Sequence, residues 1–131
     1  RTINLIGSSG SGQLCKMVNQ ICIAGLIQGL SEALMFGKKS KLNMNNVLSV
    51  ISKGAAQSWQ MDNRAFTMIK NKFDFGFAVD WMCKDLSICF DHAYLIKTKL
   101  PVTKKIYKYY KNIQKKGGNR WDTSSLISLI K

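Results

Sequence analysis

The stretch from residue 11 to residue 37 constrains the fold most. It contains no proline, and its apolar residues recur nearly all round a helical projection instead of on one face. Ser11 is suited to cap the start of a helix, and Gly37 is suited to end one. We therefore predict one long helix that lies at the centre of the core.

The middle of this helix is apolar, but its composition is not that of a membrane span. Residues 17–31 carry no charge, yet they include Asn19, Gln20 and Gln28. The stretch is also shorter than the roughly 20 apolar residues that a span needs. Because the chain has 131 residues and a hydrophobic content of 46%, we expect one globular domain with one core and no membrane partner.

Further helices are predicted along the rest of the chain, each with an apolar face at helical spacing. The expected segments are residues 42–54, 58–70, 79–97, about fifteen residues from Pro101 to the Gly117 and Gly118 pair, and a capped terminal helix in LISLI after Asp122. Only residues 1–6 have an extended pattern. The predicted fold class is all-α, a bundle of about six helices with one long central helix.

Cysteine and histidine do not form a metal-binding pattern. Cys15, Cys22, Cys83 and Cys89 contain no Cys-x-x-Cys pair, and His92 is the one histidine. A zinc site needs four ligands at closer and more regular spacing. We expect no metal, and reduced thiols that are mostly buried.

The net charge of +13 is concentrated in one part of the chain. Residues 97–120 hold nine Lys or Arg and no acid, interleaved with tyrosines such as Tyr107 and Tyr110. The pattern fits either a solvated helix face or a surface for nucleic acid or another polyanion. Arg120 is the one arginine there, and arginine is preferred for bidentate phosphate and base recognition. We therefore favour the solvated face and do not expect nucleic acid as a partner.

The glycine-rich segment GSSGSGQLCKMVNQ, residues 7–20, has several interpretations. An artificial linker would be one, but the segment joins an apolar hexad to a strong helix without interruption. A phosphate-binding loop would need Lys and Ser or Thr where Gln13 and Leu14 stand. A dinucleotide fingerprint would need GxGxxG in a βαβ unit, whereas this segment has GxxGxG. What remains is a tight turn that leads into a helix.

Lys16 lies near the start of that helix. Lys16, Asn19 and Gln20 share one face, so an ammonium and one or two amides project together beside the helix start. The helix dipole disfavours a cation in the first turn and attracts an anionic ligand. From these residues alone, the face is either a small binding site or ordinary surface.

Five segments, in order along almost the whole chain, match motifs of one family. They are GSSGSGQLCKMVNQ, similar to GxxGxGxxxK; SEALMFGKKSKLNMNNVLSVISKGAAQSW, similar to a SEAL segment, helix and Gly-x-x-x-Ser turn; FDFGFAVDWMCKDLSICFDHA, similar to F-x-x-GF followed by KDL; LPVTKKIYKYY, similar to LP-x-T; and WDTSSLISLI, similar to D-x-S-x-L-I. On these motifs the chain resembles the β-hydroxyacid dehydrogenase family, which includes 3-hydroxyisobutyrate dehydrogenase and tartronate semialdehyde reductase, with 6-phosphogluconate dehydrogenase more distant.

The resemblance implies that residues 1–131 form the C-terminal helical substrate and dimerisation domain of a two-domain enzyme, whose N-terminal Rossmann domain is absent from this sequence. The first helix would then be the interdomain helix. Lys16 matches the catalytic lysine, which exchanges a proton with the substrate oxygen. Gly10 and Gly12 match turn glycines that let substrate and cofactor approach the backbone.

The resemblance also implies the other residues of the cleft. The family often has Asn four residues after the lysine, where this chain has Gln20, with Asn19 one place earlier. Which of the two amides binds substrate stays open. Phe77, Lys84 and Asp85 match residues on the nicotinamide side of the cleft.

By resemblance, the function is that of an NAD(P)-dependent 3-hydroxyacid dehydrogenase or semialdehyde reductase. NAD or NADP would be held mainly by the absent domain, the substrate would be a small hydroxyacid or semialdehyde, and the enzyme would be a homo-oligomer. Because Arg1 is not Met and no signal-peptide pattern follows it, we expect a fragment of a longer cytoplasmic chain. Because the dinucleotide domain is missing, we expect the fragment to be inactive alone. A basic helical module for polyanions, and a truncated non-catalytic paralogue, are the alternatives.

Overall fold

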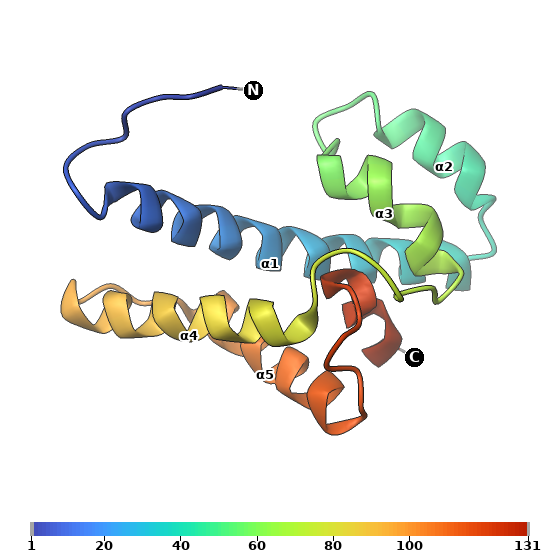
Figure 1. Ribbon diagram of the computed structural model, residues 1–131. Coiled ribbons are helices and arrows are strands. Elements are labelled where there is room, and N and C mark those ends of the chain that lie inside the picture. The colour runs from blue at the N-terminus through green and yellow to red at the C-terminus, as the bar shows by residue number, and fades with distance from the viewer. Residues whose placement is uncertain (1, 131) are drawn as a thin grey trace.

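The computed structural model describes residues 2–130 and is a bundle of six helices (Figure 1). They are α1 (Ser11–Lys39), α2 (Met44–Ile51), α3 (Trp59–Ile69), α4 (Val79–Leu95), α5 (Pro101–Lys115) and the 3-10 helix η1 (Thr123–Leu129). Within residues 2–130 the only β-type pairing is an isolated antiparallel bridge between Ala78 and Asp122. The predicted all-α bundle is confirmed.

The central position predicted for the first helix is also confirmed. In Figure 1, α1 crosses the whole view, with α2 and α3 over its C-terminal half and α4 and α5 beneath it. It packs against each of the other five helices. Its buried residues follow one side of the helix and are Gln20, Ala24, Ile27, Leu30, Ser31, Leu34 and Gly37.

The opposite side of α1 is not covered by this chain. Val18 and Phe36 are well exposed there, so the apolar residues all round the helix are buried on one side only. By length and composition alone α1 is apolar enough to cross a membrane. The buried residues along one side of α1 pack against five helices, which is typical of the core helix of a bundle.

The two ends of α1 differ from the prediction. Gly10, in a left-handed conformation with φ 92°, occupies the N-cap position, and Ser11 is already helical. Gly37 lies within the helix, which continues to Lys39. A Cβ on Gly37 would come within 2.8 Å of the sulfur of Met44. This glycine therefore allows α2 to pack closely instead of ending α1.

Several other boundaries follow from local chemistry. Asn43 caps α2 by accepting from the backbone N–H of Asn45 and Asn46, so this helix is shorter at both ends than the predicted 42–54. Ser58 caps α3 through the N–H of Met61, as the pattern indicated. α4 ends at Leu95, before the predicted residue 97, because Lys97 is left-handed with φ 56°.

The last two helices show one confirmed and one altered prediction. Pro101 begins α5, where its missing N–H costs nothing. The terminal segment is helical and capped by Asp122, as expected, but it is a 3-10 helix. Serines there bond to the nearby backbone, as Ser128 Oγ does to the Ser125 carbonyl at 2.7 Å. Such bonds compete with α-helical hydrogen bonding.

The thiols are divided between core and surface. Cys83 and Cys89 are buried, but Cys15 and Cys22 are exposed on α1, so the expectation of mostly buried thiols is wrong for half of them. All four are free. Burial raises the pKa of the Cys83 thiol to about 11 and also raises the pKa of Cys89.

Candidate functional site

A small cavity lies where the start of α1 faces the middle of α4. It has a volume of about 160 Å³ and is lined by Gln13, Lys16, Met17, Gln20, Lys84, Asp85 and Ile88. The structure thus brings together residues that are far apart in sequence and that the sequence analysis selected separately. Four of the eight predicted site residues line this one cavity.

Asp85 connects the polar side chains of the cavity. Its Oδ2 accepts a hydrogen bond from Gln20 Nε2 at 2.8 Å and lies 3.9 Å from Lys16 Nζ. The Lys16 side chain is 58% exposed, whereas that of Asp85 is 14% exposed. A pair with one exposed partner is screened by water and stabilises the fold by at most about 1 kcal/mol. Lys16 is therefore held near Asp85 but remains free to turn toward a ligand.

The two neighbouring amides have different environments. Gln20 is buried, and its amide has a partner at each end, because Oε1 accepts from Asn19 Nδ2 at 3.0 Å. Asn19 is exposed and keeps its own oxygen free of any hydrogen bond within the described residues. Of the two, only Gln20 lines the cavity, whereas Asn19 lies outside the lining and keeps an uncommitted oxygen.

Gly12 lies one turn before Lys16 and Gly10 is the N-cap residue of α1, and neither lines the cavity. A Cβ at either position would meet nothing within 4 Å, so the packing of this chain does not require them to be small. Gly10 needs glycine for its left-handed conformation. Gly12 has neither a left-handed conformation nor a close neighbour within residues 2–130 that would require glycine.

Phe77 lies apart from this cavity. It lines a separate, wider hollow of about 420 Å³ with neighbours that include Phe75, Trp81 and Arg120. Lys84 lies between the two places, since it lines the first cavity while its Nζ sits 5.5 Å from the centre of the Trp81 ring. The structure therefore does not bring Phe77 and Lys16 together. The two hollows that they line are neighbours along α4, where Lys84 lines one and Trp81 lines the other.

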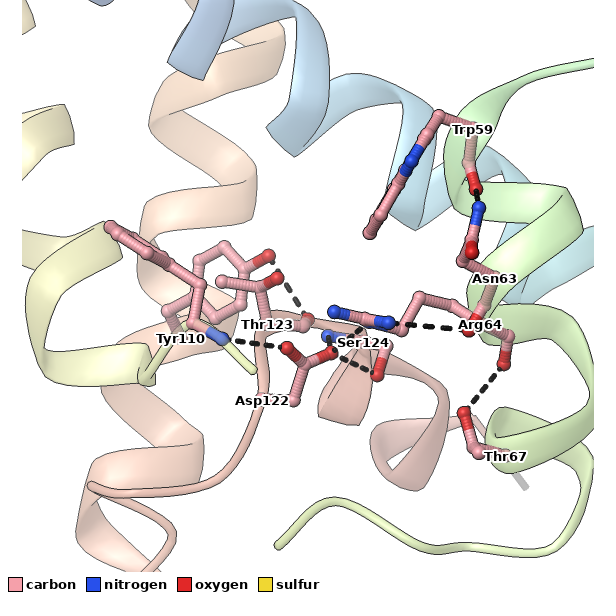
Figure 2. Close-up of polar contacts among 9 residues, drawn as sticks. Trp59, Asn63, Arg64, Thr67, Tyr110, Asp122, Thr123 and Ser124 are labelled. Carbon is pink, nitrogen blue, oxygen red and sulfur yellow. Dashed lines mark hydrogen bonds and ion pairs between the residues drawn. The ribbon is translucent and has the colours of Figure 1, made fainter. Parts of the chain in front are cut away.

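Asp122 fixes the loop that carries Phe77. Figure 2 shows its carboxylate beside Arg64 and Ser124, where Oδ1 accepts from Arg64 Nε at 3.2 Å. Oδ2 accepts the backbone N–H of Phe77 at 2.9 Å. A Cβ on Gly76, whose φ is 74°, would collide with this carboxylate. The loop conformation therefore depends on Asp122 and on glycine at position 76.

Arg64 was missed by the sequence analysis, and Asp122 was recognised only as a helix cap. The guanidinium of Arg64 stacks over the rings of Trp59 and Phe75, each at 5.0 Å from the ring centre. A single arginine within a helical pattern gives no sign of such a partner 58 residues away. The nearest signal was the aspartate of the D-x-S motif.

The basic run of residues 97–120 lies mainly on the exposed side of α5. Its buried side is formed by Thr103, Ile106, Tyr110 and Ile113. The two ion pairs found within residues 2–130 are those of Lys16 and Arg64, so the described structure gives no acidic partner within 4 Å to any cation of the run. The same residues contain no cluster of three metal-binding side chains.

Comparison with known proteins decides the family. Residues 10–130 match the family described as NAD-binding of NADP-dependent 3-hydroxyisobutyrate dehydrogenase. The chain belongs to the 3-hydroxyisobutyrate dehydrogenase family. The family resemblance drawn from the five sequence segments is confirmed at this level.

Individual relatives agree with this assignment. The chain is 54% identical over 130 residues to an uncharacterized oxidoreductase of Shewanella frigidimarina, covering 99% of this chain and 45% of the relative. It is 32% identical to the 2-hydroxy-3-oxopropionate reductase of Escherichia coli, covering 99% and 44%. The relatives of this family are thus oxidoreductases, and the chain spans less than half of their length.

Solved structures of the same family share the fold. The 3-hydroxyisobutyrate dehydrogenase of Mycobacterium tuberculosis, in a structure described with L-serine, superposes with a TM-score of 0.87 at 21% identity. The match covers 96% of this chain and 45% of that one. The helical bundle is therefore the fold of part of a 3-hydroxyisobutyrate dehydrogenase.

Proposed function

We propose that this chain is the C-terminal helical half of an NAD(P)-dependent dehydrogenase that interconverts small 3-hydroxyacids and semialdehydes. The observation that carries the proposal is the position of Lys16. Its ammonium lies at a small polar cavity, 3.9 Å from a carboxylate that a second helix supplies. Membership of a family of oxidoreductases supports a redox reaction at that cavity.

The residues present suit a small substrate and one edge of a cofactor. At about 160 Å³, the cavity is smaller than the roughly 300–1,000 Å³ of pockets that enclose drug-sized ligands. By the family resemblance, a dinucleotide would be held mainly by an N-terminal Rossmann domain of the intact protein. The chemistry that a bound nicotinamide would supply is hydride transfer to or from the substrate carbon. Lys84 and Asp85 would face it from α4, and Phe77 from the neighbouring hollow.

Lys16 supplies the proton. In the reducing direction its ammonium donates a proton to the carbonyl oxygen as that oxygen gains negative charge, and in the oxidising direction the neutral amine removes the hydroxyl proton. Gln20 lines the same cavity, and the oxygen of Asn19 lies next to it, outside the lining. The open space at Gly10 and Gly12 allows substrate to approach the start of α1.

Exposed apolar side chains support further partners for this half. Residues 2–6 are extended and expose Ile3 and Leu5 almost completely. Tyr94 and Leu95, at the end of α4, are exposed to a similar degree. We expect these surfaces to be covered by the preceding domain or by a second copy, and the helical half alone to be inactive. The test is substitution of Lys16 in the intact protein, with turnover and cofactor binding measured separately.

The basic side of α5 supports a second candidate function, binding of nucleic acid or another polyanion. Lys104, Lys108, Lys111 and Lys115 follow one line along the helix, and none has an acidic partner within the described structure. Such a surface would bind duplex DNA with an affinity that falls steeply with salt. A gel shift at low salt tests it, and no shift there would exclude this function.

A further inference from the structure

Gln20 is the buried link between α1 and α4 at the candidate site. The residue is only 5% exposed, and its Nε2 donates to Oδ2 of Asp85 at 2.8 Å. The same carboxylate oxygen faces Lys16 Nζ at 3.9 Å. The amide of Gln20 and the ammonium of Lys16 therefore interact with the same atom, Asp85 Oδ2.

The orientation of the Gln20 amide is fixed at its other end as well. Its Oε1 accepts a hydrogen bond from Asn19 Nδ2 at 3.0 Å, which leaves Nε2 directed at Asp85. No other hydrogen bond to the Asp85 carboxylate is present within residues 2–130. Gln20 is thus the one side chain of this part of the protein that holds Asp85 in place.

We propose that Gln20 is a positioning residue, which orients Asp85 so that Asp85 in turn directs the Lys16 ammonium into the cavity. This rests on the proposed function, and it gives Gln20, which lines the cavity, a role through Asp85 instead of direct contact with substrate. Lys16 needs such direction because its long, largely exposed side chain has many rotamers. A proton donor must lie within hydrogen-bond reach of the reacting oxygen, and small misplacements reduce the rate strongly.

The first experiment replaces Gln20 with Met in the intact protein, which keeps the length of the side chain and removes its hydrogen bonds. We expect kcat to fall on the order of 10- to 100-fold, because Lys16 is misplaced. The KM values for cofactor and substrate should stay close to those of the wild type. A large rise in substrate KM with unchanged kcat would overturn the proposal, since it would show direct binding of substrate by Gln20.

A matched control lies two turns along the same helix. Gln28 also donates to a carboxylate, that of Glu32 at 2.8 Å, but it is remote from the cavity. Gln28→Met should leave kcat unchanged. An equal loss of kcat in this variant would show a general effect of altering α1 and would overturn the proposal. If Gln20→Met does not fold by circular dichroism, Gln20→Leu, which is uncharged and likewise cannot donate to Asp85, provides the same comparison.

A double-mutant cycle with Asp85→Asn distinguishes action through Asp85 from independent action. If Gln20 acts through Asp85, then adding Gln20→Met to Asp85→Asn should reduce kcat little further, because both substitutions remove the same positioning of Lys16. Full additivity would overturn the inference while leaving the proposed function intact. Absence of turnover in the intact wild-type protein would instead overturn the proposed function and the inference with it.

Discussion

Lys16 and Asp85 face each other across the packing of α1 on α4, with 3.9 Å between Nζ and Oδ2. They are 69 positions apart in the chain, and neither helix alone would make a site. The pair is too exposed to contribute much to stability. Its position at a small cavity that also holds Gln20 and Lys84 gives it a functional meaning instead.

Asp85→Asn separates the two roles. We expect the free energy of unfolding to change by less than about 1 kcal/mol, because an amide oxygen still accepts from Gln20 and the ion pair is screened. Turnover of the intact protein should fall on the order of tenfold or more, because Lys16 loses its charge partner. Asp91→Asn, an exposed acid further along α4, is the control and should leave both quantities unchanged.

Asp122→Asn should strongly destabilise the fold. The change leaves the guanidinium of Arg64 without its charged partner in a largely buried position. Breaking a buried ion pair in this way costs about 3–5 kcal/mol. Urea unfolding measures the loss, and Asp62→Asn, an acid on an exposed hydrogen bond, is the matched control. A loss below about 1 kcal/mol for Asp122→Asn would contradict the role of Asp122 in fixing the loop that carries Phe77.

Two glycine substitutions should have opposite effects on the stability of the protein. Gly76→Ala places a methyl group against the Asp122 carboxylate in a left-handed conformation, so we expect a loss of about 1–3 kcal/mol. Gly29→Ala adds a methyl group in open space inside α1 and should stabilise by about 0.5–1 kcal/mol. Thermal unfolding of the two variants tests the pair. Equal shifts would contradict the loop geometry.

Alkaline pH should destabilise the protein in a defined range. The pKa of Cys83 is raised from 9.0 to about 11 by burial, and burial also raises the pKa of Tyr110. Because the folded state holds these protons more tightly, the contribution of Cys83 to stability is complete below pH 9 and is lost as pH rises toward 11, and that of Tyr110 is lost only above its ordinary pKa of 10. Urea unfolding at several pH values measures this fall, and Cys83→Ala should reduce it. A stability independent of pH from 9 to 11 would contradict the buried thiol.

The helix pattern was predictable because it depends on local signals. Pro101 and Ser58 mark helix starts by their own chemistry, and both are where the sequence placed them. Gly37 misled the prediction because glycine serves both for helix ends and for close packing. Only the position of Met44 shows which applies.

The candidate site was predictable in its residue types but not in its contacts. The motif containing Lys16 and the KDL segment each pointed to a site, yet only the packing of α1 on α4 shows that Gln20 bonds to Asp85. The ion pair between Arg64 and Asp122 could not be predicted from local sequence signals, because the two residues come from separate elements. Side-chain pairs of this kind depend on tertiary structure.

The central claim is that Lys16 is the proton donor of a two-domain dehydrogenase. The most direct measurement is NAD(P)H oxidation by the intact protein with small semialdehydes, for the wild type, Lys16→Ala and the control Lys38→Ala at the far end of α1. We predict that Lys16→Ala lowers kcat by about 10²- to 10⁴-fold, with cofactor Kd unchanged, while Lys38→Ala matches the wild type. Turnover by Lys16→Ala at the wild-type rate would contradict the account.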